Sequence, residues 1–376
     1  MKKVVIFYGP RDEFKKIIPN NKARNLTDLV MEIDSDSNTL KLELPNSETK
    51  QKEKIKVTNF VVGSDEYTGV KEHVIINFIN FLAKIEVENL YLHNPPLSIS
   101  TQILNLYPDT DVIQHKYKLL SENNIIDIYK AYGDKIKGQN NVCMKLLQAL
   151  LPLTSGKRTK PVVILFYGDT GLGKTETAQL ISDILGEKLF RKQFSMFQNN
   201  QFATYLFGGA HYERSFAKDL LDRESNVILL DEFDKANSTF HSAFYQIFDE
   251  GIYEDQNYHL ELFQSIIICT SNYKSEDDIK SHLGKAIFSR FDAVIKFSSL
   301  SVEAKEQITT MQYYKKLAEY DEENQKVIVD SNIYDKLLQY TCQCNNAREI
   351  SHLIEQTFSR VLLNKLFIEL NNHDIT

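Results

Sequence analysis

The sequence predicts an α/β fold in which a parallel-sheet domain with a glycine-rich loop follows one α/β domain and precedes a helical domain. The glycine-rich segment, residues 168–175, lies between an apolar run and a helical pattern, as in a strand–loop–helix unit. Apolar strands and helical segments alternate over residues 160–298, which is typical of a parallel sheet. From Ser301 onward the pattern is mostly helical. The expected domains are residues 1–120, 125–298 and 299–376.

Composition limits the classes of function that the chain suits. Its 376 residues contain 44 Lys and Arg against 51 Asp and Glu, a net charge of −7, which argues against a general nucleic-acid binder. No apolar run is long enough to cross a bilayer. The apolar stretch behind Met1 ends at Gly9 and Pro10, which is too short for a secretory signal. We therefore expect a cytoplasmic protein with no membrane partner.

The first 120 residues predict a separate α/β unit that carries no family motif we recognise. Polar residues 46–54 suggest a hairpin loop, so that residues 55–62 form the returning strand. Apolar spacing over residues 70–85 predicts one helix. Polar residues 121–124 predict a linker to the next domain. The expected strands cover residues 4–8, 40–44, 55–62, 90–92 and 112–113, with a short helix near Ile103 before the last strand.

One polar loop in this N-terminal unit has two interpretations. The residues His93, Asn94, Pro95 and Pro96 follow a strong strand pattern. A polar loop at the carboxyl end of a strand can bind a ligand. A proline-rich turn explains the same residues, and the sequence favours the turn.

The glycine-rich loop has the pattern G-x-x-x-x-G-K-[ST], which binds the phosphates of a nucleotide. Its glycines let backbone N–H groups point at phosphate oxygens, and the start of the next helix adds partial positive charge. We expect Lys174 to reach the β- and γ-phosphates and the Thr175 hydroxyl to bind Mg²⁺. The residues expected to contact the nucleotide here are Gly168, Asp169, Thr170, Gly171, Leu172, Gly173, Lys174, Thr175 and Glu176.

Two further apolar runs end in polar residues suited to hydrolysis. The run from Asn226 ends in Asp231 and Glu232, at the strand end where open α/β sheets bind ligands. We expect Asp231 to hold Mg²⁺, directly or through water, and Glu232 to polarise the attacking water. The run from Ser265 ends near Asn272, whose amide can help hold that water.

Six segments in a fixed order extend this pattern into a family resemblance. Together with the loop they resemble the AAA+ ATPases, and among these the Clp-type protein unfoldases, over about residues 130 to 370. The match includes an adenine-contacting box, an extended Walker B segment, sensor 1, an arginine-finger segment and sensor 2. The segments are Ile136–Gln139, Asp231–Ala236, Ala243–Gly251, Ser271–Asn272, Phe288–Asp292 and Asn346–Arg348.

The resemblance implies roles for residues that the loop alone does not assign. It implies that Ile136 touches adenine and that Arg348 contacts the γ-phosphate from the helical lid of the same chain. It implies that Arg290 acts on ATP bound by the neighbouring subunit, in a homo-oligomeric ring of six. ATP and Mg²⁺ are the implied cofactors. The implied work is remodelling or unfolding of a protein client, which we expect the N-terminal domain to select.

One departure from the family leaves the function open. Clp-type unfoldases carry an aromatic-glycine pore loop, whereas residues 206–216 are several residues shorter and lack Gly-aromatic-x-Gly. Tyr212 is the nearest aromatic that can grip a peptide, and a packed loop tyrosine explains it equally well. This departure puts processive threading in doubt and leaves ATP hydrolysis untouched. The alternatives are an ATP-gated regulatory or defence switch and a nucleic-acid-dependent AAA+ motor.

The role implied for Arg290 gives a first prediction. An arginine finger is worth on the order of 10³–10⁵ in rate, or roughly 4–7 kcal/mol, whereas a surface ion pair is worth about 0–1 kcal/mol. We expect Arg290→Ala to keep the fold and ATP affinity nearly intact while removing most hydrolysis, as measured by phosphate release. Near-normal turnover of this variant would show that the finger is elsewhere or absent.

Overall fold

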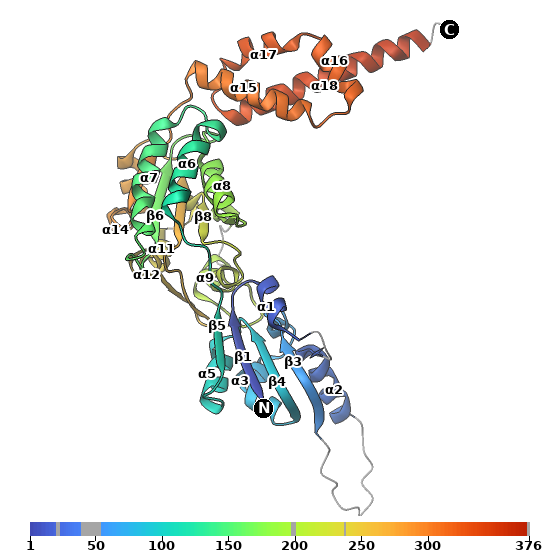
Figure 1. Cartoon of the computed structure of the whole chain (residues 1–376), viewed down its shortest axis with the longest axis vertical. Helices are drawn as coiled ribbons and strands as arrows, with labels where there is room; N and C mark the ends of the chain where they lie inside the picture. Colours follow the sequence, from blue (N-terminus) through green and yellow to red (C-terminus); the bar gives the residue numbers. More distant parts are fainter. Residues whose placement is uncertain (20–22, 39–53, 197–200, 237, 374–376) are drawn as a thin grey trace, which may run out of the picture.

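The protein has three parts along its long axis in this computed structural model, which describes residues 1–19, 23–38, 54–196, 201–236 and 238–373. An N-terminal sheet domain lies at one end, a larger sheet domain lies in the middle, and helices α15 to α18 lie at the other end (Figure 1). Among the described residues, no helix combines the length and apolar character needed to span a membrane.

The N-terminal domain is built on a five-stranded parallel sheet in the order β2-β3-β4-β1-β5. Its larger core contains Ile6, Phe60 and Leu92, and a smaller core on the other face contains Phe7 and Phe14. The strands are β1 (Lys3–Tyr8), β2 (Ala23–Arg24), β3 (Ile55–Val62), β4 (Ile85–His93) and β5 (Asp111–Gln114). The helices are α1 (Arg11–Ile17), α2 (Leu26–Asn38), α3 (Glu72–Ile76), α4 (Phe78–Leu82) and α5 (Leu97–Leu106), with the 3₁₀ turn η1 (Glu66–Thr68).

Two sequence expectations for this region differ from the structure, and one lies outside the described residues. Strand β3 forms at the predicted residues and runs parallel to its neighbours β2 and β4. The strand expected at 40–44 and residues 46–53 of the expected loop lie outside the described residues. The helix expected over 70–85 is two helices, because Asn77 leaves helical geometry (φ −116°, ψ 42°) and its amide donates to the His73 carbonyl at 3.2 Å.

The second difference concerns the expected linker at residues 121–124, which instead begins helix α6 (Glu122–Lys135). The Ser121 hydroxyl accepts from the Asn124 N–H at 3.3 Å, and the Asn124 side chain accepts from the Ser121 N–H at 3.0 Å. This reciprocal capping explains why a polar stretch starts a helix here.

The large domain contains a second five-stranded parallel sheet in the order β12-β6-β11-β8-β7. Its strands are β6 (Val162–Tyr167), β7 (Phe190–Gln193), β8 (Val227–Asp231), β11 (Ile266–Ser271) and β12 (Ala293–Lys296), and β9 (Ile252–Glu254) pairs antiparallel with β10 (His259–Glu261). Its helices are α6, α7 (Asn140–Thr154), α8 (Lys174–Leu185), α9 (Gln201–Phe207), α10 (Phe216–Leu221), α11 (Ser238–His241), α12 (Tyr245–Glu250), α13 (Glu276–Leu283) and α14 (Lys285–Phe288), with the 3₁₀ turns η2 (Phe194–Met196), η3 (Phe233–Lys235) and η4 (Ser242–Phe244).

The register of this sheet positions the candidate site. Central strands β6, β8 and β11 are buried along their whole length, so one core covers each face of the sheet. Ser271 aligns with Tyr167, and Gln193 aligns with Asp231. The loops after β6, β8 and β11 therefore leave the same edge, because parallel strands end together.

The helical lid follows β12 and shares one core with the large domain. Ile308 and Phe358 from the lid belong to the same buried cluster as Ile164 and Phe166 from the sheet. Helix α16 is the most polar of the lid helices, and of its nine residues only Ile328 is buried. The lid helices are α15 (Val302–Leu317), α16 (Glu322–Asp330), α17 (Ile333–Thr341) and α18 (Ala347–His373).

The N-terminal domain is fastened to the large domain by specific polar contacts. The Leu97 N–H donates to the Asn257 carbonyl at 2.8 Å, and the Arg11 N–H donates to the Asp222 carboxylate at 3.1 Å. The Arg223 guanidinium lies over the Tyr117 ring, 4.0 Å from its centroid. Because Arg223 is buried, this cation–π contact is shielded from water and holds the two domains together.

Candidate nucleotide site

The glycine-rich loop joins β6 to α8 and adopts a backbone that requires glycine. Gly168, Gly171 and Gly173 have φ values of 131°, 70° and 102°. A Cβ on Gly168 would lie 2.4 Å from the Phe297 carbonyl oxygen, so the chain there passes too close to β12 for any side chain. Helix α8 begins at Lys174 directly after the loop, so its first N–H groups face the cavity that the loop encloses.

Lys174 connects the glycine-rich loop to Asn272, which directly follows strand β11. Its ammonium group donates to the carbonyls of Gly168 at 2.5 Å and Asp169 at 2.8 Å, and to the Asn272 side-chain oxygen at 3.2 Å. Burial lowers the pKa of Lys174 to about 8, while the negative charges of Asp231 and Asp234 act in the opposite direction. The structure therefore brings together the predicted lysine, the predicted amide and the Asp231 carboxylate.

Thr270 binds both acidic residues at the end of β8, Asp231 through its carboxylate and Glu232 through its backbone. Its hydroxyl donates to the Asp231 carboxylate at 2.5 Å and accepts from the Glu232 N–H at 2.9 Å. Glu232 has a positive φ of 55°, which is rare for a side chain of this size and turns it away from the line of the strand. Gln193 donates to the Glu232 carboxylate at 3.1 Å. Asp231 and Glu232 therefore point in different directions, although Thr270 binds both residues.

The Asp231 carboxylate also pairs with Arg191 from β7, whose Nε lies 3.0 Å from it. Sequence reasoning missed Arg191, Gln193 and Thr270. The first two lie beside β8 only because of the strand order, so no motif marks them. Thr270 had a signal in the sequence, since it directly precedes the Ser271-Asn272 pair at the strand end.

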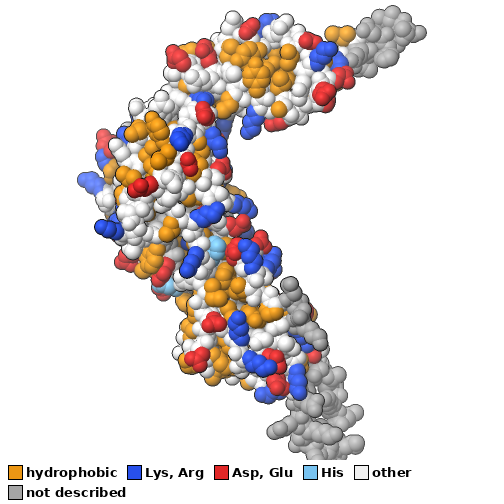
Figure 2. Space-filling view, viewed as in Figure 1, with side chains coloured by type: hydrophobic (Ala, Val, Ile, Leu, Met, Phe, Trp, Pro, Cys, Tyr) orange, Lys and Arg blue, Asp and Glu red, His pale blue; other side chains and the backbone are white. Residues whose placement is uncertain are grey.

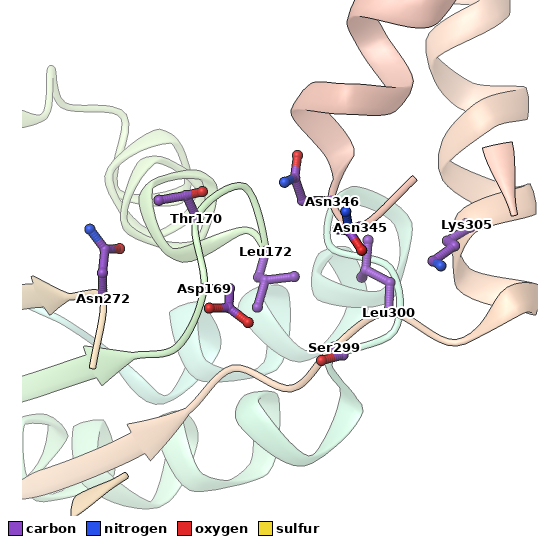
Figure 3. A pocket seen from close by; sticks show the side chains of 9 residues that line it. All are labelled: Asp169, Thr170, Leu172, Asn272, Ser299, Leu300, Lys305, Asn345 and Asn346. Carbon is purple, nitrogen blue, oxygen red and sulfur yellow. The ribbon is translucent and has the colours of Figure 1, made fainter. Parts of the chain in front are cut away.

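Two cavities border the glycine-rich loop. The first, of about 400 Å³, lies between the loop and the lid, and Figure 3 shows Asp169, Thr170 and Leu172 on the loop facing Asn345 and Asn346 from the lid. The second, of about 250 Å³, is lined by residues predicted to contact the nucleotide, among others: Ile136, Gly171, Leu172, Gly173, Glu176 and Arg348. The structure therefore gathers Ile136, Glu176 and Arg348 around the same loop.

The lid rests directly on the glycine-rich loop. The Ala347 N–H donates to the Gly171 carbonyl at 3.0 Å, and a Cβ on Gly171 would lie 3.0 Å from the Asn346 side-chain oxygen. Arg348 follows these residues at the start of α18. Lid and loop are thus joined at the point where a phosphate chain would lie between them.

Arg290 lies apart from the loop of its own chain. Its Nε donates to the Asp249 carboxylate at 2.8 Å and its Nη1 to the Ala286 carbonyl at 2.6 Å, while the guanidinium lies 4.1 Å from the centroid of the Tyr245 ring. None of these partners belongs to the glycine-rich loop or lines either cavity beside it. Arg290 is thus positioned at the surface by three neighbours.

The residues present fit a nucleotide with Mg²⁺. The Ser271 hydroxyl is buried and has no hydrogen-bond partner among the described residues, although it stands between Thr270 and Asn272. Thr175 and Asp231 supply the hydroxyl and carboxylate oxygens that Mg²⁺ prefers, and the cation usually completes its shell with phosphate and water. Lys174, Arg348 and the backbone of the loop supply positive charge and donors for phosphate oxygens.

Residues 159–364 match the family model described as "AAA domain (Cdc48 subfamily)". The chain belongs to the AAA+ ATPases of the Clp type. The AAA+ family accounts for the nucleotide site described above, and it makes nucleotide binding a property of this chain.

Individual AAA+ proteins are similar to part of the chain. The chaperone protein ClpB of Malacoplasma penetrans (strain HF-2) is 22% identical over 267 residues, 64% of this chain and 38% of the relative. The subunit ClpE of Lactococcus lactis subsp. lactis (strain IL1403) is 31% identical over 215 residues, 48% of this chain and 28% of the relative. The chain therefore spans less than two fifths of the length of these curated relatives.

A solved structure supports the AAA+ fold. The closed state of Hsp104 with ATPγS and FITC casein, determined by cryo-EM, superposes with a TM-score of 0.55 at 15% sequence identity. The match covers 98% of this chain and 89% of that chain. At this identity the similarity concerns the fold alone.

The pairing of Arg191 with Asp231 generates a prediction about metal binding. We expect Arg191→Gln to lower the Mg²⁺ concentration for half-maximal binding of an ATP analogue by up to about fivefold, because the Arg191 side chain is 44% exposed and an ion pair screened by water is worth about 0–1 kcal/mol. The measurement is a Mg²⁺ titration with a fluorescent nucleotide. Arg214→Gln is the control, since the Arg214 side chain is 85% exposed and its ion pair with Asp219 is long, at 3.8 Å. An unchanged requirement in Arg191→Gln would show that Arg191 does not compete for Asp231.

Proposed function

We propose that this chain hydrolyses ATP between its large domain and its lid, and that rings of it use the hydrolysis to remodel a protein client. The observation that carries the proposal is the joint between lid and loop. Ala347 binds the Gly171 carbonyl while Lys174 binds Asn272, so the same loop contacts the lid on one side and the sheet on the other. A nucleotide held there links the angle of the lid to the state of its phosphates.

The residues of the site divide the work of hydrolysis. Lys174 and Arg348 neutralise the growing negative charge on the phosphates, which is the main demand of phosphoryl transfer. Glu232 orients and polarises the attacking water, and Asn272 helps to hold that water. When bound, Mg²⁺ neutralises phosphate charge, and the Thr175 hydroxyl and Asp231 carboxylate are the protein ligands that would hold it.

Arg290 completes the site of a neighbouring subunit in this proposal. Its place at the surface supports this role, because Asp249, Ala286 and Tyr245 hold it in position away from its own glycine-rich loop. The lid also exposes large apolar side chains such as Met311, Tyr314 and Tyr340, and Figure 2 shows hydrophobic side chains gathered on one face of the lid. Apolar faces of this kind favour contact with another protein surface. The ring that we propose has six subunits, as the family resemblance implies.

The segment at the place of the family's pore loop supports a second function. His211 is buried and its Nε2 lies 3.1 Å from the carbonyl oxygen of Val70 in the N-terminal domain. Asn257 donates to the Gly209 carbonyl at 2.8 Å, while Tyr212 remains 59% exposed. Because the contact of His211 with Val70 ties the segment to the N-terminal domain, a movement of the segment would reach that domain directly. This favours an ATP-gated switch as the alternative to client threading.

The two functions are separated by the response to an unfolded protein. We expect unfolded casein to raise the ATPase rate several-fold and to form an ATP-dependent complex with Glu232→Gln, whose own hydrolysis falls by about 10² or more because the water is no longer polarised. Phosphate release and size-exclusion chromatography are the measurements. Glu224→Gln, a surface change that removes only an ion pair with Lys188, should behave like the parent.

Other responses would identify a different function. A rate that rises with DNA or RNA, with a steep dependence on salt, would make the chain a nucleic-acid motor. Hydrolysis that ignores casein and both nucleic acids, with no retained casein, would contradict remodelling and support the switch.

A further inference from the structure

The N-terminal domain has a cavity at the carboxyl edge of its own sheet. Its volume is about 470 Å³, and it is lined by Arg11 after β1, Gly63 after β3 and His93 at the end of β4, among others. Helix α1 follows β1 and packs on the smaller core, whereas α5 follows β4 and packs on the larger core, so the connections after these two neighbouring strands lie on opposite faces of the sheet. Ligands of open α/β sheets bind at the carboxyl ends of the strands, at a point of this kind.

The edge of the sheet beside this cavity is rigid. The Asn94 side chain accepts from the Gly9 N–H at 2.9 Å and donates to the Gly9 carbonyl at 3.0 Å, so it pairs with both backbone groups of one residue. Asn94 itself has a φ of 45°, and a Cβ on Gly9 would lie 2.3 Å from His115. Strained positions of this kind persist where the surrounding structure holds them, and they are common at binding sites.

His93 lines this cavity, and one of its ring nitrogens has no hydrogen-bond partner among the described residues. The residue is completely buried, and its Nε2 lies 2.8 Å from the Gly9 carbonyl, so the ring proton is on Nε2. Burial lowers the pKa of His93 to about 4, which keeps the ring neutral. Its Nδ1 therefore has a lone pair and no partner among the described residues. A buried acceptor without a donor is costly unless a ligand or water supplies one.

The rest of the lining offers charge of both signs and an apolar wall. Arg11, Lys15 and Arg24 are cationic, Asp65 and Glu66 are acidic, and Phe14, Ile18 and Val61 are apolar. Arg11 Nη1 lies 3.1 Å from the Asp65 carboxylate, which leaves other donors of this guanidinium free for a second anion. Cations suit a phosphate, carboxylates suit the hydroxyls of a sugar, and an apolar wall suits a base.

We propose that this cavity binds a nucleoside monophosphate. The phosphate lies against Arg11 and Arg24, the ribose hydroxyls donate to Asp65 and Glu66, and a donor of the ligand satisfies His93 Nδ1. The volume is within the range of small-molecule sites. The site is separate from the glycine-rich loop and makes the N-terminal domain a receptor for a small molecule. It does not depend on whether the ring remodels proteins.

The test is calorimetric titration of the full chain with AMP, GMP, UMP and CMP, after the glycine-rich loop has been saturated with a non-hydrolysable ATP analogue. We expect saturable binding of at least one of the four, with one site per chain. Arg11→Gln and Arg24→Gln should each weaken that binding by about tenfold or more, as expected for loss of a charged hydrogen bond. Lys2→Gln is the control. Lys2 precedes the first residue of β1 and pairs with Glu88, so it lies at the amino edge of the sheet, opposite the cavity.

The same titration with the matching nucleoside and with inorganic phosphate completes the experiment. Binding at least tenfold weaker for both would show that the site recognises sugar and phosphate together. No saturable binding of any of the four nucleotides would overturn the proposal. Equal binding of inorganic phosphate, or unchanged binding in folded Arg11→Gln and Arg24→Gln, would also overturn it.

Discussion

The parallel pairing of β11 with β6 on one side and β8 on the other is the constraint on which the nucleotide site depends. It ends three strands at one edge, so the glycine-rich loop, the Asp231-Glu232 pair and Asn272 leave the sheet together. Lys174 then reaches Asn272, and Thr270 reaches both Asp231 and Glu232. A slip in the register of β11 would separate these groups, because the side chains of a strand alternate between its faces.

The residues that the sequence singled out around the glycine-rich loop lie close together in the structure, and they could be singled out because each part of the candidate site is local. Each apolar strand runs directly into the residues that follow it, so the loop, the carboxylates and Asn272 can be recognised without knowledge of the fold. Arg191 and Gln193 were missed because they meet β8 only through the order of strands in the sheet. Arg290 and Arg348 were assigned by family resemblance, and their roles remain proposals. The structure places Arg348 beside the loop and Arg290 away from it.

The N-terminal domain was harder to predict, since its elements depend on distant contacts. Asn77 divides an apolar pattern that predicts one helix, and β3 pairs with β2 and β4, which are distant from it in sequence. The loop at His93 had the composition of a turn. His93 is buried with Phe14 stacked on its ring and Gly9 bound to its Nε2, and its Nδ1 has no partner in the part of the chain that the structure describes. No local sequence pattern contains these contacts. This domain is held to the ATPase domain through Arg11, Val70 and Leu97.

The central claim is that two subunits build each hydrolytic site, and a mixing experiment tests it most directly. Glu232→Gln lacks the residue that polarises water in its own site. Arg290→Ala lacks the arginine that acts on ATP bound by the neighbouring subunit. In randomly mixed rings, about a quarter of the sites combine an intact Glu232 with an intact Arg290 from the next subunit. The account predicts that mixing two inactive variants restores about that fraction of ATP hydrolysis. A mixture that forms rings and stays as inactive as its components would contradict it.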